Sequence, residues 1–161
     1  MPDALGVVHG WATSLDLEVT PSADGLVVTM PGTARREVPV AITATAQALV
    51  FECFVARGTD EDPRRLHAFL LQRNRRAFGA AYAIDAHGDV YLIGRLPLAS
   101  ADATGIDLVM ASILGMADGD FNTILELAYP EAIAREWRWR LARGESIENL
   151  RAFEHLRPRD V

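Results

Sequence analysis

The stretch DAHGD places Asp85, His87 and Asp89 two residues apart. Alternate residues of a strand share a face, so these side chains can converge on a metal ion or act as acid–base groups. That chemistry would suit a small metal-dependent hydrolase. The stretch is also typical of a short hairpin loop, because Gly88 tolerates positive φ and the acids accept turn hydrogen bonds. We favour the turn, since alternating apolar segments flank it and no further ligand cluster stands out.

A second polar cluster is the run QRNRR, which contains Arg73, Arg75 and Arg76. Guanidinium groups bind phosphate and carboxylate, so the run is a candidate site for nucleic acid or for an acidic partner. It also lies at the end of a helical pattern, where the helix dipole favours cations. The net charge of −6 argues against general nucleic-acid or anionic-membrane binding, so we interpret the run as a solvated helix end.

The segment EWRWR carries two tryptophans on one predicted helix. At 3.6 residues per turn Trp139 points about 200° away from Trp137, so one of them faces solvent, the tail or another chain. Tryptophan and arginine are enriched at binding hot spots, although Trp139 can equally pack under the tail or stack on Arg135 or Arg143. The partner-binding candidates are Trp139, Trp137, Arg73, Arg75 and Arg76.

The sequence contains none of the common catalytic motifs. It has no GxSxG, P-loop, GxGxxG or HExxH pattern, and His9, His67 and His155 lack a local catalytic partner. Cys53 lies in an apolar strand and is interpreted as a buried, unreactive thiol. We therefore expect no catalytic, cofactor-binding or metal-binding residues and no enzymatic activity.

Apolar periodicity and turn residues divide the chain into helices and strands. A short helix is expected over residues 2–14, and LDLEVT can begin extended structure. In the helix that follows Pro63, Leu66, Phe69, Leu70 and Phe78 are candidates for the buried stripe. The strands are expected at 26–30, 37–43, 48–55, 81–84 and 90–96, and further helices at 106–128, with a possible bend at 118–120, and at 131–143.

Two of these strands carry specific expectations. Pro39 cannot donate a ladder hydrogen bond, so its strand lies at a sheet edge or Pro39 faces outward. The strand Ala48–Val55 has apolar residues on both faces, which predicts a central strand covered at least partly on both sides.

The order of elements predicts an α+β fold: helix, three strands, helix, two strands, helix, helix. Short links favour an antiparallel sheet with helices packed on it. The 161 residues suit one domain, which we assign to 1–143, followed by a C-terminal tail at 144–161. A single cysteine, a poor signal peptide and the lack of a long apolar run favour a cytoplasmic protein.

The stretch LLQRNRRAFGAAYAIDAHGDVYLIGRLPL resembles the YbjN family as its actinobacterial members read. The likeness is carried by an LxRN element at Leu71, Arg73 and Asn74, a D-x-x-G-D-V-Y-L turn starting at Asp85, and LPL at 96–98. VVTMPGTARREVPV and DFNTILELAYPEAIAREWRWR are also similar, so the resemblance spans roughly residues 15–140.

The resemblance implies a fold like that of type III secretion chaperones. Such chaperones are homodimers that bind extended segments of partner proteins and have no catalytic residues. YbjN proteins are described as regulators of sensory transduction. The resemblance therefore implies a chaperone-like protein- or peptide-binding module that forms a homodimer, needs no cofactor and regulates sensory transduction or protein stability.

Overall fold

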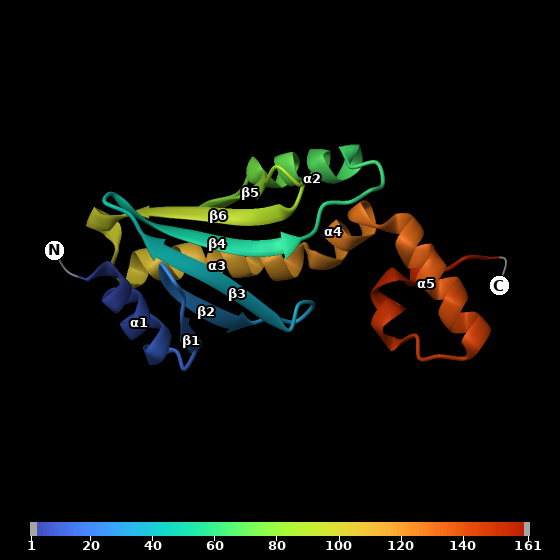
Figure 1. The fold of residues 1–161 in the computed structure, drawn as a ribbon, viewed down its shortest axis with the longest axis horizontal. Helices are drawn as coiled ribbons and strands as arrows, with labels where there is room; N and C mark the ends of the chain where they lie inside the picture. Colours follow the sequence, from blue (N-terminus) through green and yellow to red (C-terminus); the bar gives the residue numbers. More distant parts are fainter. Residues whose placement is uncertain (1–2, 160–161) are drawn as a thin grey trace.

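The computed structural model describes residues 3–159 of the chain, and its strands form one six-stranded antiparallel sheet (Figure 1). The elements in chain order are α1 (Ala4–Ser14), β1 (Glu18–Pro21), β2 (Gly25–Pro31), β3 (Glu37–Ala44), β4 (Ala48–Ala56), α2 (Arg64–Asn74), β5 (Ala80–Ile84), β6 (Val90–Pro97), η1 (Leu98–Ser100), α3 (Ala103–Gly119), α4 (Phe121–Ala128), α5 (Pro130–Arg143) and η2 (Glu148–Leu156). The strand order is β1-β2-β3-β4-β6-β5. The α+β class and the antiparallel sheet predicted from the sequence are confirmed.

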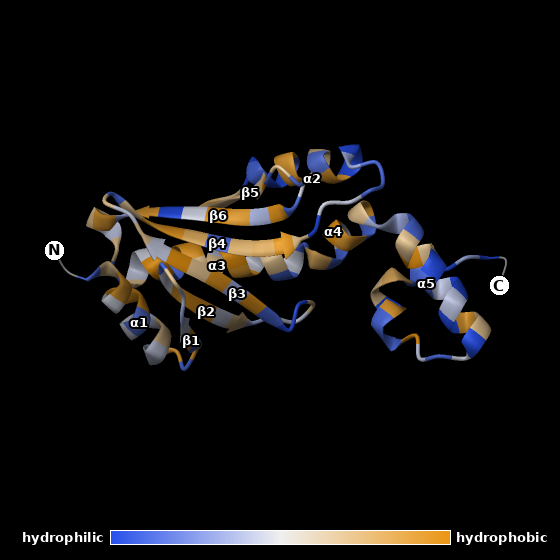
Figure 2. Ribbon diagram, viewed as in Figure 1, coloured by the Kyte–Doolittle hydropathy of each residue, from blue (hydrophilic) through white to orange (hydrophobic). Residues whose placement is uncertain are grey.

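One face of the sheet carries the main core. Strand residues two apart point to this face, and the buried residues of α3 pack on β3, β4 and β6. In Figure 1 α3 passes behind β3, next to β4. A Cβ at Gly94 would lie 2.6 Å from a methyl group of Val109, so the glycine lets α3 cross β6 closely. Figure 2 shows the same division, with apolar residues along the strands and α3. Fully buried members of this core include Val8, Val28, Ile42, Leu49, Phe51, Leu66, Leu92, Ile106, Met110, Ile113 and Ile124.

Among residues 3–159 no helix packs on the opposite face of the sheet, and this corrects the expectation for the strand at 48–55. β4 is central, between β3 and β6, but Val50 is only half-buried and Glu52 and Phe54 are exposed. The sequence shows apolar residues on both faces of β4 without showing whether anything covers them.

The structure has four strands before α2 where the sequence predicted three. The additional strand, β1, has four residues and ends at Pro21, so its sequence signal is short, and it forms by pairing Val19 with Val28 of β2. Pro39 faces outward, as expected, and lies beyond the β3–β4 ladder, which begins at Ala41.

The predicted stripe of α2 is only partly correct. Leu66 and Leu70 are buried and Phe69 is half-buried, but the helix ends at Asn74 and Phe78 lies in the following turn with 70% of its surface exposed. The predicted helix at 2–14 begins at Ala4, and Pro2 lies outside the described residues.

The predicted helix at 106–128 divides where DGD suggested a bend. α3 and α4 meet at Asp120 with an angle of 49° between them. Within residues 3–159 no single helix is long and apolar enough to cross a membrane, although this bent pair passes the same test of length and composition when taken together.

The end of the chain forms a second, smaller core. Trp137 of α5 is fully buried against Leu150 and Phe153 of η2, and its Nε1 donates a hydrogen bond to the carbonyl of Phe153 at 3.2 Å. α5 and η2 touch the main body mainly through α4, so this unit projects from one end of the sheet (Figure 1). The assignment of a boundary after Arg143 stays a prediction.

Candidate functional site

The DAHGD stretch is the turn between β5 and β6. The Asp85 carboxylate accepts hydrogen bonds from the backbone N–H groups of His87 (2.8 Å) and Asp89 (2.9 Å). The Asp89 carboxylate accepts one from the backbone of Gly58 at 2.6 Å, and Gly88 has a φ of 82°. Both carboxylates are thus engaged in holding the loop, and no group of three potential metal ligands occurs among residues 3–159.

Arg73 is a structural residue rather than a free cation. Its Nε donates to Oδ2 of Asp120 at 2.8 Å, and the hydroxyl of Tyr82 donates to the same oxygen at 3.0 Å. Burial and the Asp120 charge raise the pKa of Tyr82 well above its usual range, and the hydrogen bond to Asp120 raises the pKa of Arg73. Asp120 is the one buried charged residue of the described chain. Sequence reasoning missed this network because its members are 38 and 47 residues apart.

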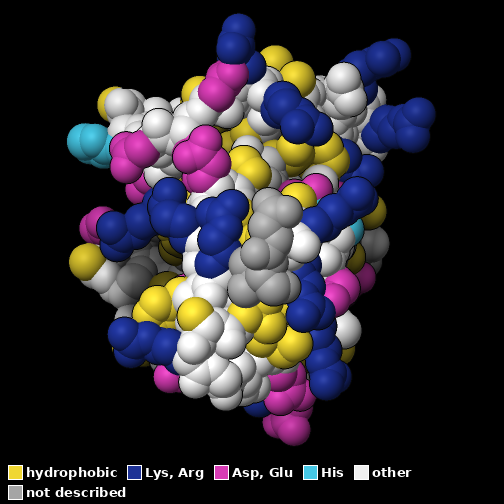
Figure 3. Space-filling view, turned by 90° about the vertical axis from the view of Figure 1, so that its right-hand side faces the viewer, with side chains coloured by type: hydrophobic (Ala, Val, Ile, Leu, Met, Phe, Trp, Pro, Cys, Tyr) yellow, Lys and Arg dark blue, Asp and Glu magenta, His cyan; other side chains and the backbone are white. Residues whose placement is uncertain are grey.

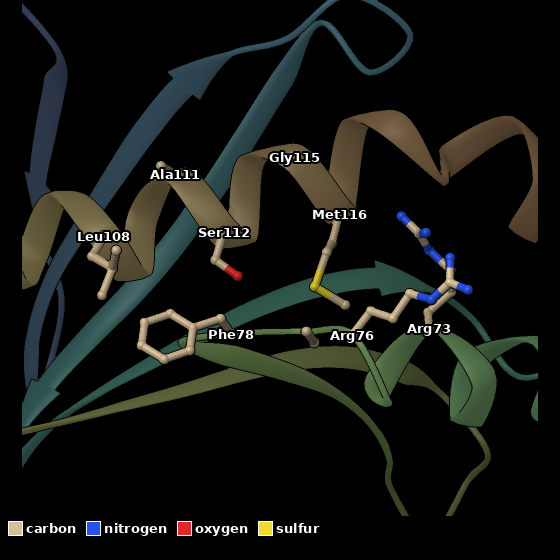
Figure 4. A pocket seen from close by; sticks show the side chains of 9 residues that line it. Arg73, Arg76, Phe78, Leu108, Ala111, Ser112, Gly115 and Met116 are labelled. Atoms are coloured by element: carbon tan, nitrogen blue, oxygen red, sulfur yellow. The ribbon is translucent and has the colours of Figure 1, made fainter.

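Arg75 and Arg76 remain exposed after the end of α2. Arg76 lies at one end of a groove of about 390 Å³ between α3 and the turn that joins α2 to β5. Figure 4 shows Phe78 and Leu108 at the other end, with Met116 between the two helices. The α3 residues that line the groove between these ends are small, namely Ala111, Ser112 and Gly115.

Four large apolar side chains are exposed around this groove and along the neighbouring α2–β5 contact. Leu71 is 68% exposed, Phe78 70%, Ile84 48% and Leu108 47%. Leu71 and Ile84 border a second apolar hollow, which lies between α2 and β5. We call these four residues the α2–β5 apolar surface. Contiguous exposed apolar residues mark interaction sites in soluble proteins.

The open face of the sheet is a second candidate surface. Phe54 of β4 and Tyr91 of β6 meet edge to face with ring centroids 5.5 Å apart. On the same face Ile93 lies next to this pair, opposite Glu52, and Val50 lies one pair further along, opposite Arg95. The charged side chains of Glu52 and Arg95 therefore alternate with the apolar residues of this patch. The sequence indicated Val50 and Phe54 as apolar, but it assigned them to a strand covered at least partly on both sides.

The two tryptophans of EWRWR lie on opposite sides of α5, as their spacing predicted. Trp137 is fully buried, which removes its side chain from the surface available to a partner. Trp139 is 44% exposed, and the guanidinium of Arg143 lies 5.0 Å from its ring centroid. The expected cation–π contact is therefore present, and Trp139 does not pack under the tail.

Cys53 is a buried thiol of the main core. It is fully inaccessible, and burial raises the pKa of its thiol, so little reactive thiolate forms at neutral pH. This agrees with the interpretation of an unreactive cysteine.

Comparison with known proteins matches most of the main body. Residues 4–126 match the model of the YbjN family, described as "Putative bacterial sensory transduction regulator". An uncharacterised protein of Mycobacterium tuberculosis is 44% identical over 133 residues, which cover 83% of this chain and 73% of that protein. An uncharacterised protein of Mycobacterium leprae is 44% identical over 131 residues, covering 81% and 71% of the two chains.

Solved structures share the fold at low sequence identity. YbjN from E. coli aligns with a TM-score of 0.55 at 11% identity, covering 74% of this chain and 91% of that one. A chain of the HopA1–SchA chaperone–effector complex aligns at 0.51 with 15% identity, covering 71% and 89%. A chain of the ExoU–SpcU complex of Pseudomonas aeruginosa aligns at 0.52 with 14% identity, covering 75% and 97%. The chain therefore has a type III secretion chaperone-like fold.

Proposed function

The chain belongs to the YbjN family, and from that premise we propose that it is a non-enzymatic, chaperone-like module that binds a protein or peptide partner as a homodimer. Its fold neighbours include a chain from a chaperone–effector complex and one from the ExoU–SpcU complex. The family description, a regulator of sensory transduction, is compatible with a protein that acts by binding another protein. A cytoplasmic setting stays a prediction from the sequence.

The observation that carries the proposal is the presence of two separate apolar surfaces on one small domain. The α2–β5 apolar surface suits contact with a second copy, because Phe78 and Leu108 line the groove and Leu71 and Ile84 line the neighbouring hollow between α2 and β5. The open sheet face, with Val50, Phe54, Tyr91 and Ile93, suits an extended partner segment. Extended segments and amphipathic helices are the usual ligands of such exposed surfaces.

The dimer is tested by measuring molar mass with light scattering during size-exclusion chromatography. We expect a dimer for the unmodified chain and a monomer for Leu71→Asp and Phe78→Asp, because each buries a carboxylate in an apolar interface. Leu15→Asp is the matched control, since Leu15 is 52% exposed but lies outside this surface. A chain that is monomeric at all concentrations would refute the homodimer.

The partner site is tested by placing a photo-crosslinking amino acid at position 54 or 93 on the sheet face and at position 15 as a control. We expect polypeptide adducts from the sheet positions and few from position 15. Mass spectrometry of the adducts identifies the bound segment. Equal crosslinking at all three positions, or none, contradicts peptide binding on the sheet.

A further inference from the structure

The exposed face of α5 carries a regular stripe of side chains that belongs to neither of the two apolar surfaces of the main body. Arg135, Trp139 and Arg143 stand at positions i, i+4 and i+8, so they line up along one side of the helix. All three are exposed, and an open, shallow hollow lies over Arg135 and Trp139. The stripe lies outside residues 4–126, the part that matches the family model.

The two arginines of the stripe have no acidic partner within the described chain. The ion pairs formed within residues 3–159 do not include Arg135 or Arg143, and the nearby Glu136 is already paired with Arg140 at 2.6 Å. All sixteen basic residues of the chain are arginines, and seven of them lie in residues 130–159 beside five glutamates. Figure 3 shows basic side chains spread over this end of the molecule. A net-acidic protein thus presents a locally basic face here.

The helix beneath the stripe is held in place by the second core. On its inner side Trp137 is buried, and Arg140 donates to the carbonyl of Ser146 at 2.6 Å. Gly144 ends the helix in the left-handed conformation with a φ of 66°. Because the inner side is fixed, the three outer side chains project from a rigid element, which lowers the entropic cost of binding.

We propose that the stripe of Arg135, Trp139 and Arg143 binds an extended acidic segment of a partner protein with the pattern acid–x–apolar–x–acid. The stripe spans about 12 Å, at 1.5 Å of rise per residue. In an extended peptide, residues i, i+2 and i+4 share a face and span about 13 Å. Two carboxylates can therefore reach the two guanidinium groups. The apolar residue between them contacts the part of the Trp139 ring that the Arg143 guanidinium, 5.0 Å from the ring centroid, leaves exposed. This inference rests on the proposed function and adds a site and the chemistry of the ligand.

The chemistry of the stripe favours an extended segment over other ligands. A partner helix would need a continuous apolar seam, whereas this stripe offers one aromatic ring between two charges. The chain has a net charge of −6, so its overall electrostatic field repels nucleic acids and anionic membranes. Binding either of them needs a larger basic surface than this stripe. An acidic peptide requires only the two guanidinium groups and the ring.

The test is fluorescence anisotropy with a labelled peptide that contains Glu-Thr-Phe-Thr-Glu and with a scrambled control, Glu-Glu-Thr-Thr-Phe. We expect the first to bind at low ionic strength and to lose about tenfold in affinity with Trp139→Ala or Arg135→Glu. Arg151→Glu is the matched control, since Arg151 is exposed in η2, outside the stripe, and should change binding little.

Exchanging the charges of the stripe and of the peptide provides the decisive test. The double variant Arg135→Glu with Arg143→Glu should bind a peptide containing Lys-Thr-Phe-Thr-Lys and reject the acidic one. Equal binding of the scrambled peptide, an equal loss with Arg151→Glu, or tighter stripe-dependent binding of single-stranded DNA or phosphatidylserine vesicles would overturn the proposal. Circular dichroism checks that each variant is folded. The dimer and sheet-face experiments use other residues, so the proposed function and this site can fail independently.

Discussion

The side chain of Asn74 pairs with both backbone polar groups of Tyr82. Its Oδ1 accepts from the Tyr82 N–H at 2.7 Å and its Nδ2 donates to the Tyr82 carbonyl at 3.1 Å. Tyr82 is the middle residue of β5, which is an edge strand of the sheet. The side-chain amide of Asn74 therefore forms the two hydrogen bonds that a neighbouring strand would form with Tyr82. It thereby blocks pairing of this edge with another chain.

Replacing Asn74 with alanine should reopen that edge. Asn74→Ala leaves both Tyr82 groups without their partner, and we expect a loss of about 1–3 kcal/mol in unfolding free energy together with slow self-association. Urea titration measures the first effect and light scattering over time the second. Gln72→Ala, on an exposed position of the same helix, should change neither. If both variants behave alike, the edge is protected by something other than Asn74.

The buried Asp120 should contribute more to the free energy of unfolding than the exposed residues near it. Asp120→Ala removes the acceptor for both Arg73 and Tyr82, so we expect a loss of about 1–3 kcal/mol. Tyr82→Phe should cost about 1 kcal/mol, because it deletes the donor and leaves Asp120 paired with Arg73. Arg76→Ala serves as the control and should be near neutral in chemical denaturation. Similar losses in all three variants would mean that the network is not a specific source of stability.

Asp118 gives a pH-dependent prediction. Its carboxylate accepts hydrogen bonds from the backbone N–H groups of Arg35 (2.8 Å) and Thr33 (2.9 Å), which lower its pKa below the usual 3.8. A carboxyl whose pKa is depressed in the folded state stabilises the fold above the unfolded value, and this contribution is lost as the pH falls through the folded value. Asp118→Asn should therefore lower the urea midpoint at neutral pH.

The difference between the native chain and Asp118→Asn should shrink as the pH falls below 3.8. Urea midpoints measured across the acidic range test this directly. Asp107→Asn, at an exposed position of the same helix, controls for the general effect of removing one charge. A difference that stays constant with pH would show that the ionised carboxylate does not hold the β2–β3 turn.

The predictions from sequence succeeded where the signal is local. Gly88 with its flanking alternation predicted the hairpin, and the spacing of Trp137 and Trp139 predicted that the two rings point to opposite sides of the helix. DGD predicted the break between α3 and α4. Each of these follows from residues a few positions apart, because turn chemistry and helical period depend on neighbours in the chain.

The errors arose where the answer depends on distant residues. Phe78 follows the apolar period of α2, but the helix ends at Asn74, whose side chain turns to cap Tyr82. Val50 and Phe54 are apolar in either environment, so only the tertiary structure shows that no helix covers them. The role of Arg73 depends on Asp120, which is 47 residues away. The local sequence therefore indicates a free basic run.

Substitutions in the turn between β5 and β6 can distinguish a structural role of this turn from a metal-binding role. Asp85→Ala removes the acceptor for two backbone N–H groups, so we expect a loss of about 1 kcal/mol or more in unfolding free energy. His87→Ala should be neutral, since His87 is exposed and contributes its backbone rather than its ring. Thermal unfolding with and without Zn²⁺ or Mn²⁺ provides the measurement. A metal site predicts metal-induced stabilisation that both substitutions abolish.

Substitution of Trp137 tests whether the end of the chain unfolds separately from the sheet. Its side chain is fully buried, but its buried partners are Leu150 and Phe153 rather than residues of the main core. Trp137→Ala should therefore destabilise α5 and the tail by about 3–5 kcal/mol, as for other buried aromatic residues, and leave the sheet intact. Hydrogen exchange followed by mass spectrometry should show faster exchange over residues 130–156 and unchanged protection in β4 and β6.

Phe51→Ala, in the main core, should produce the reverse pattern. If Trp137→Ala instead speeds exchange throughout, the two cores form one cooperative unit, because the contacts through α4 then couple them.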